Sequence, residues 1–328
     1  MDERLLRADG LLKAGKVSES CDLLMELVND APDQPANVYR VLVVQLYNLK
    51  RYEDGAAMAQ RGVERHPREF VLWNTLGVLL RRLQRYEEAL KALDQAQKLD
   101  PKSLAPLTNR ANILNDMANG PAAEAAFIKL SRADPRNPEY HRGLARALLA
   151  QKKYDAAFAR CRQAIALKKD YVDAWLDWSG GEASRGDLTK ALEVTEKAIA
   201  AAPGEPRLLE SKAALLRRLG QFSAAEAFLT ELLPKHGDEA WLAFTLGGVI
   251  GDQDRQRANA YLLRATELDP GNAEYLTALM ESYERSRHGD EGANIEAGYQ
   301  LLVKMLDENA HPKSPKHNKV YNELLIRV

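Results

Sequence analysis

The chain contains 328 residues, of which 45% are hydrophobic and 28% are charged, and its formal net charge is −1 at pH 7. This composition is typical of an ordered, soluble helical protein. The balanced charge argues against recruitment by nucleic acid or by an anionic membrane, because both favour an excess of basic residues. No apolar run is long enough to cross a bilayer, and the N-terminal MDERLLRADG lacks the basic and apolar segments of a secretion signal.

Pairs of amphipathic helices recur along the chain, and prolines mark where most of the second helices end. Proline supplies no N–H and disfavours a helical residue before it, so each such position predicts a helix terminus. The positions are Pro32, Pro67, Pro101, Pro135, Pro203 and Pro270, with Lys169 at the equivalent place in the fifth repeat. This frame predicts about nine repeats, over residues 1–35, 36–69, 70–103, 104–137, 138–171, 172–205, 206–238, 239–272 and 273–312.

The third repeat shows the pattern most clearly. Apolar residues recur at helical spacing in both of its halves, and they are Leu72, Leu76, Leu79 and Leu83, then Tyr86, Ala89, Leu93 and Ala96. The repeat resembles the tetratricopeptide repeat, and the resemblance is carried by Trp73, Leu76, Gly77, Leu80, Tyr86, Ala89, Leu93, Ala96 and Pro101. Leu80 and Leu93 replace two aromatic residues of the family pattern. The resemblance implies an all-α, right-handed superhelical solenoid, with the first helices lining the concave surface and the second helices outside.

Two later repeats depart from the pattern through glycine. In the sixth repeat, residues 180–182 read GGE where small or bulky apolar residues are expected. The eighth repeat contains Gly247, Gly248 and Gly251, in a run that we expect to lie inside a helix. These glycines either let a ligand backbone come close or soften the array, and the sequence does not decide between the two.

The two ends of the chain also diverge. The first repeat lacks the signature aromatic residue, as expected where a terminal repeat meets water. The ninth repeat carries an insertion near residues 286–294. Residues 313–328 are predicted to form either a capping helix over the ninth repeat or the start of a following domain.

The sequence contains none of the motifs that mark catalytic, nucleotide or metal sites. There is no GxxxxGK[ST], no GxGxxG after a strand, no HExxH, no CxxC and no GxSxG. Only His311 and His317 are close to each other among the histidines, and no carboxylate or cysteine cluster accompanies them. Cys21 and Cys161 lie on apolar helix sides in distant repeats, which favours buried thiols in a reducing compartment. We therefore expect no catalytic residue, no cofactor, no metal and a cytoplasmic location.

Polar residues recur at the positions of the first helices that face the groove in tetratricopeptide folds. In repeats two to five these residues are Asn37, Arg40, Asn74, Arg81, Thr108, Asn109, Asn112, Asn115, Arg142 and Arg146. Asparagine is a weak helix former, so its repetition within helices indicates a role. Its amide both donates and accepts, and it can therefore pair with the N–H and C=O of an extended peptide backbone. These ten residues are our candidate groove, and the simpler interpretation is that they are solvated polar positions.

Two functions remain open. The first is a protein-interaction module that binds an extended segment of a partner protein in this groove. The second is the substrate-recruiting N-terminal region of a larger enzyme, an O-linked glycosyltransferase or a sulfotransferase, because large O-linked sugar transferases use an asparagine-lined tetratricopeptide groove. The terminal-carboxylate grip of chaperone cofactors is disfavoured, since Val44 and Arg146 stand where its asparagine is expected. RNA binding is disfavoured by the net charge, and the oligomeric state is left open.

Overall fold

The secondary structure is helical throughout the part of the chain that the structure, a computed structural model, describes: residues 3–251, 253–270 and 272–286. These residues form seventeen helices and no strand, so the all-α prediction is confirmed. The second helix of the predicted ninth repeat, the predicted insertion after Ser286 and the segment 313–328 lie outside the described residues.

The helices belong to two compact units, residues 1–168 (the N-terminal unit) and residues 169–328 (the C-terminal unit). The N-terminal unit contains α1 (Glu3–Lys13), α2 (Val17–Asp30), α3 (Ala36–Asn48), α4 (Tyr52–Arg65), α5 (Phe70–Arg82), α6 (Tyr86–Leu99), α7 (Ala105–Asp116), α8 (Gly120–Ala133), α9 (Pro138–Ala150) and α10 (Tyr154–Leu167). The C-terminal unit contains α11 (Val172–Arg185), α12 (Leu188–Ala201), α13 (Pro206–Arg218), α14 (Phe222–His236), α15 (Ala240–Ile250), α16 (Arg255–Leu268) and α17 (Ala273–Ser286).

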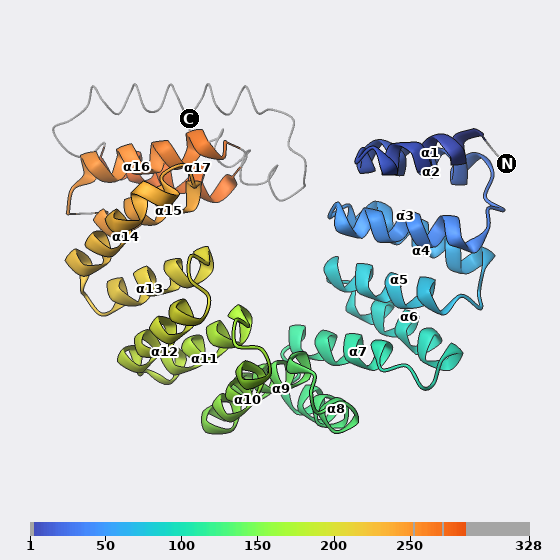
Figure 1. Cartoon of the computed structure of the whole chain (residues 1–328), viewed down its shortest axis with the longest axis horizontal. Helices are drawn as coiled ribbons and strands as arrows, with labels where there is room; N and C mark the ends of the chain where they lie inside the picture. Colours follow the sequence, from blue (N-terminus) through green and yellow to red (C-terminus); the bar gives the residue numbers. More distant parts are fainter. Residues whose placement is uncertain (1–2, 252, 271, 287–328) are drawn as a thin grey trace. The chain divides into compact units, whose positions relative to one another are not determined.

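Each unit is built from two layers of helices (Figure 1). In the N-terminal unit the odd-numbered helices form one layer, in which α3 contacts α5, α5 contacts α7 and α7 contacts α9. The even-numbered helices form the second layer, and each of α4, α6 and α8 packs against the odd-numbered helices on either side of it. The C-terminal unit repeats this arrangement, with α14 packed against α13 and α15, and α16 against α15 and α17. We call the odd-numbered helices of both units the first helices.

The core of each helical pair follows from the apolar periodicity. In the third pair, Leu72 and Leu79 of α5 and Leu93 of α6 are completely buried. Burying one leucine side chain contributes about 2 kcal/mol to folding, so each pair depends strongly on its neighbour. Gly77 lets the two helices cross closely, because a Cβ atom there would lie 2.6 Å from Cγ of Leu93.

The turn within each of the first seven pairs has one residue in the left-handed backbone region. This position is held by Lys50, Gln84, Ala118 and Lys152, with φ between 55° and 60°, and by Gly15, Gly186 and Gly220. The next residue closes the turn, as when Arg51 donates its backbone N–H to the carbonyl of Leu46 at 2.9 Å. This is the Schellman arrangement, which satisfies carbonyl groups at a helix C-terminus. It is retained although four of the seven residues are not glycine, and the left-handed conformation costs each of these four about 1–2 kcal/mol.

The glycines of the sixth and eighth predicted repeats have different surroundings. Gly180 lies within the unbroken helix α11, and apart from its chain neighbours and the backbone of its own helix no atom lies within 4 Å of the position where its Cβ would be. In α15, Gly247 is packed against α16, since its Cβ would lie 2.7 Å from Cγ of Leu262. The expectation that the whole glycine run is helical is wrong at Gly251. There α15 has already ended at Ile250, and φ is +40°.

Candidate functional site

The predicted groove residues lie on consecutive first helices of the N-terminal unit. Asn37 and Arg40 of α3 are exposed. The other eight are half-buried, namely Asn74 and Arg81 of α5, Thr108, Asn109, Asn112 and Asn115 of α7, and Arg142 and Arg146 of α9. Because α5, α7 and α9 contact one another in sequence, these side chains form one polar surface across three helices. We call the surface on these three helices the polar face.

Two asparagines of the polar face tie neighbouring first helices together. Asn109 Nδ2 of α7 donates to Asn74 Oδ1 of α5 at 3.0 Å. Asn115 Nδ2 of α7 donates to the backbone carbonyl of Gly143 in α9 at 2.9 Å. A longer hydrogen bond, from Thr108 Oγ1 of α7 to the Tyr140 hydroxyl of α9 at 3.4 Å, joins the same two helices. The asparagines therefore have a structural role that the sequence alone does not show.

Hydrogen-bonding capacity remains after these contacts are made. A carboxamide offers two N–H donors and a carbonyl oxygen with two acceptor positions. The bond between Asn74 and Asn109 uses one donor and one acceptor position, and it leaves the Asn74 amide nitrogen and the Asn109 carbonyl oxygen available. Asn112, one helical turn from Asn109, forms no side-chain hydrogen bond within the residues that the structure describes. The pair and Asn112 can thus present both donors and acceptors to a ligand.

The arginines of the polar face are organised by an aspartate that the sequence analysis missed. Asp116, at the end of α7, accepts a hydrogen bond from Arg81 Nε of α5 at 2.5 Å. Its other carboxylate oxygen lies 3.6 Å from Arg146 Nη2 of α9. Arg40 lies farther along the layer and pairs with Glu69 at 3.7 Å. Arg81 and Arg146 are therefore held by internal charge, and only part of their donor capacity is available to a ligand.

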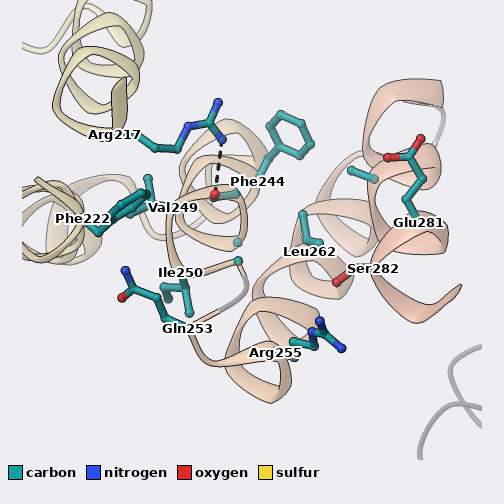
Figure 2. Close-up of a pocket in the computed structure, with 14 residues that line it drawn as sticks. Arg217, Phe222, Phe244, Val249, Ile250, Gln253, Arg255, Leu262, Glu281 and Ser282 are labelled. Carbon is teal, nitrogen blue, oxygen red and sulfur yellow. Dashed lines mark hydrogen bonds between the residues drawn. The ribbon is translucent and has the colours of Figure 1, made fainter. Parts of the chain in front are cut away.

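A second polar site lies in the C-terminal unit, where the sequence analysis named only glycines. Glu210 and Arg217 of α13, Phe244 and Gly248 of α15, and Glu274 and Tyr275 of α17 line a cavity of about 390 Å³. Arg217, Phe244 and Gly248 also line an adjoining cavity of about 560 Å³ (Figure 2). Glu210 occupies the same kind of helix position as the predicted residues of the N-terminal unit, so the same slot rule, carried into the seventh repeat, would have found it.

Burial and charge both act on this second site. The pKa of the Glu210 carboxyl is raised above its usual value, mainly because the group is partly buried and also because the negative charge of Glu274 is near. Arg217 points over α15 and donates from Nη1 to the Gly248 carbonyl at 3.3 Å (Figure 2). The rings of Phe244 and Tyr275 have centroids 4.7 Å apart.

Neither a cluster of metal-ligating side chains nor a membrane-spanning helix is found among the described residues. Among them, no group of three or more histidine, cysteine, aspartate or glutamate side chains is placed to hold a metal ion. None of their helices combines the length and the apolar character that crossing a membrane requires. Cys21 and Cys161 are both buried as free thiols, as predicted, and burial raises the pKa of the Cys21 thiol.

Several solved structures share this fold. A tetratricopeptide repeat protein from Parabacteroides merdae has a TM-score of 0.54 and 18% identity, covering 75% of this chain and 98% of that one. The type IV pilus biogenesis factor PilW has a TM-score of 0.53 and 17% identity, covering 63% and 96%. The Cut9–Hcn1 hetero-tetramer of the APC/C has a TM-score of 0.51 and 15% identity, covering 85% and 55%.

Comparison of the sequence identifies one similar protein and three segments that match models of a known family. Cellulose synthase operon protein C of Xanthomonas axonopodis pv. citri is 26% identical over 323 residues, which cover 87% of this chain and 21% of that protein. The chain therefore spans about a fifth of the length of that relative. Models of the tetratricopeptide repeat match residues 70–103, 108–172 and 183–245. These matches fall on the helical pairs described above, and the chain belongs to the tetratricopeptide repeat family.

Proposed function

We propose that the polar face of the N-terminal unit binds an extended segment of a partner protein through its peptide backbone. Tetratricopeptide repeat proteins bind protein partners, and their fold is generally a non-catalytic scaffold for such interactions. The observation that carries the proposal is the asparagine pair that joins α5 and α7, with Asn112 beside it.

The chemistry of the pair favours a peptide backbone as the ligand. The Asn74 amide can donate to a carbonyl, and the Asn109 carbonyl can accept from an N–H. In an extended segment the N–H and the C=O of one residue point to the same side of the chain, so a single residue can offer both groups to this face. Because the bond between Asn74 and Asn109 already orients both side chains, less conformational entropy is lost when a ligand binds. The half-buried setting also strengthens each hydrogen bond relative to one in water.

The test begins with peptides selected from a random, unconstrained library on the immobilised chain. Their affinity is then compared between the unaltered protein and the Asn109→Ala plus Asn112→Ala double variant. Two lost side-chain hydrogen bonds cost about 1–3 kcal/mol together, which corresponds to binding that is about 5- to 150-fold weaker. The matched control is Gln60→Ala plus Gln163→Ala, which removes two exposed carboxamides from the second helices α4 and α10. Circular dichroism melting shows whether each variant keeps its helices.

A second arm asks which part of the peptide is read. N-methylation of single backbone positions removes one N–H donor at a time, whereas alanine substitution leaves the backbone intact. Recognition of the backbone requires that N-methylation at some positions abolish binding and that most alanine substitutions be tolerated. Equal affinity of the double-alanine variant and the control, or a peptide read only through its side chains, would reject the proposal.

A further inference from the structure

The smaller cavity of the C-terminal unit combines charge with aromatic surface. Its lining comes from three first helices, α13, α15 and α17, and its volume is about 390 Å³. This size is within the range of about 300–1,000 Å³ that is usual for ligand pockets. The adjoining cavity of about 560 Å³ shares part of the lining, so a ligand that fills the first has room to continue into the second.

Neither glutamate of this cavity is neutralised by an ion pair among the described residues, although the charge of Arg207, which is itself paired with Asp173 at 2.8 Å, acts on Glu210. Within the part of the chain that the structure describes, neither the Glu210 nor the Glu274 carboxylate forms an ion pair or a side-chain hydrogen bond. Glu210 is half-buried, and its pKa is raised by this burial and, to a smaller extent, by the neighbouring negative charge of Glu274. Two carboxylates in one cavity repel each other, and a cation between them would remove that repulsion.

The aromatic side of the cavity also favours a cationic ligand. Phe244 and Tyr275 place their rings 4.7 Å apart with an angle of 35° between their planes, and both rings line the cavity. A guanidinium or ammonium group gains from the electron-rich face of such rings. The one arginine in the lining, Arg217, donates a hydrogen bond to the Gly248 carbonyl, and no ion pair joins it to either glutamate. Gly248 adds open space, since the nearest atom to a Cβ built there is the flexible end of Arg217 at 3.6 Å.

We propose that this cavity receives one arginine or lysine side chain from an extended segment of a partner protein. Arginine is the better fit, because its planar guanidinium can meet a carboxylate with two hydrogen bonds while it stacks on an aromatic ring. The residues that flank the basic side chain occupy the adjoining cavity, which is why the occupant is a polypeptide rather than a free cation. The site lies in the C-terminal unit and is independent of the asparagines proposed for the N-terminal unit.

The test uses random decapeptide libraries in which the fifth residue is fixed as arginine, lysine, citrulline or glutamate. Basic and acidic residues are omitted from the variable positions, and retention on the immobilised full chain is measured by fluorescence. Citrulline has nearly the shape of arginine without its charge. The expected result is at least about tenfold greater retention of the arginine library than of the citrulline library, with lysine between them. This comparison needs no variant, so it does not depend on whether a mutant folds.

Variants then assign the preference to the cavity. Glu210→Gln plus Glu274→Gln removes both charges with little change in shape, and Tyr275→Leu removes one ring while keeping an apolar side chain. Both are expected to reduce the preference for arginine to about twofold or less. Glu193→Gln plus Glu231→Gln removes two exposed charges from the second helices α12 and α14 and is expected to retain the preference.

Several results would overturn the proposal. Equal retention of the arginine and citrulline libraries on the unaltered chain is one, and a preference that survives in the Glu210 and Glu274 double variant is another. Displacement of the arginine library by free arginine amide at the concentration of a matched arginine peptide would show that a small cation, not a polypeptide, is the occupant.

Discussion

The adjacent glycines of α15 provide the sharpest test of the packing described above, because the same substitution should act in opposite directions. Replacing either Gly247 or Gly248 with alanine gains helix propensity, worth about 0.8–1.0 kcal/mol in a helix interior. Only the surroundings of the added methyl group differ. At Gly247 the new Cβ would lie 2.7 Å from Cγ of Leu262 and 3.2 Å from the Ala258 carbonyl. At Gly248 the nearest atom is 3.6 Å away, at the end of the Arg217 side chain.

These distances set the magnitudes. Leu262 is 5% exposed and has little room to move, so Gly247→Ala carries an overpacking cost of about 1–3 kcal/mol. After the gain in propensity, it should be destabilising by up to about 2 kcal/mol. Gly248→Ala meets only a flexible side chain and should be stabilising by up to about 1 kcal/mol. The two variants should therefore differ by about 1–3 kcal/mol.

Urea denaturation followed by far-ultraviolet circular dichroism measures this difference, and native-state amide exchange of α15 and α16 localises it. Localisation matters because the repeats of a solenoid do not always unfold as one cooperative unit. The reasoning would be refuted if both variants changed stability in the same direction by similar amounts. That result would mean that α15 and α16 do not cross as closely as the contact between Gly247 and Leu262 requires.

Two further predictions concern charge. Because the folded-state pKa of Glu210 is raised, its contribution to stability is present below the usual glutamate pKa and is lost as the pH rises through the raised value. Glu210→Gln should therefore raise the urea midpoint near neutral pH and leave it unchanged near pH 4, whereas a rise of the same size at both pH values would contradict the burial of Glu210. Asp116→Asn, measured in the same way at neutral pH, should cost about 1–2 kcal/mol, because Arg81 and Arg146 lose their shared partner. A double-mutant cycle with Arg81→Gln should show coupling, and strictly additive effects would refute the link between α5 and α7.

The helical pairs and their crossings could be predicted because they depend on local periodicity. Leucines at helical spacing indicate which side of α5 is buried, and a glycine at the crossing indicates where α6 approaches. The extent of burial is less predictable, since it also depends on the neighbouring pair. Trp73 occupies a signature position of the family, yet it is half-buried and lines an open cavity of about 640 Å³ between α4, α5 and α6. Its indole N–H donates to the Pro67 carbonyl at 2.9 Å.

The polar face could be predicted only as a set of positions. A slot rule finds each residue within its own repeat, but it does not show which side chains meet across repeats. The bond from Asn109 to Asn74 joins residues 35 positions apart, and nothing local to either residue indicates it. Asp116 escaped notice because an aspartate at the end of a helix resembles a solvated terminus. Whether the ten predicted residues bind a partner stays a prediction, and the double-asparagine variant addresses it.

The side-chain links between successive first helices have a consequence for the spacing of contacts along a bound peptide. Packed helices lie about 8–10 Å apart, while an extended polypeptide advances about 3.3 Å per residue. A strand laid across α5, α7 and α9 would thus step from one helix to the next about every three residues. Because the asparagine links hold the helices at a fixed spacing, the protein rather than its ligand would determine how many peptide residues separate successive contacts. Insertion of one residue into a bound peptide should then disturb contacts on only one side of the insertion.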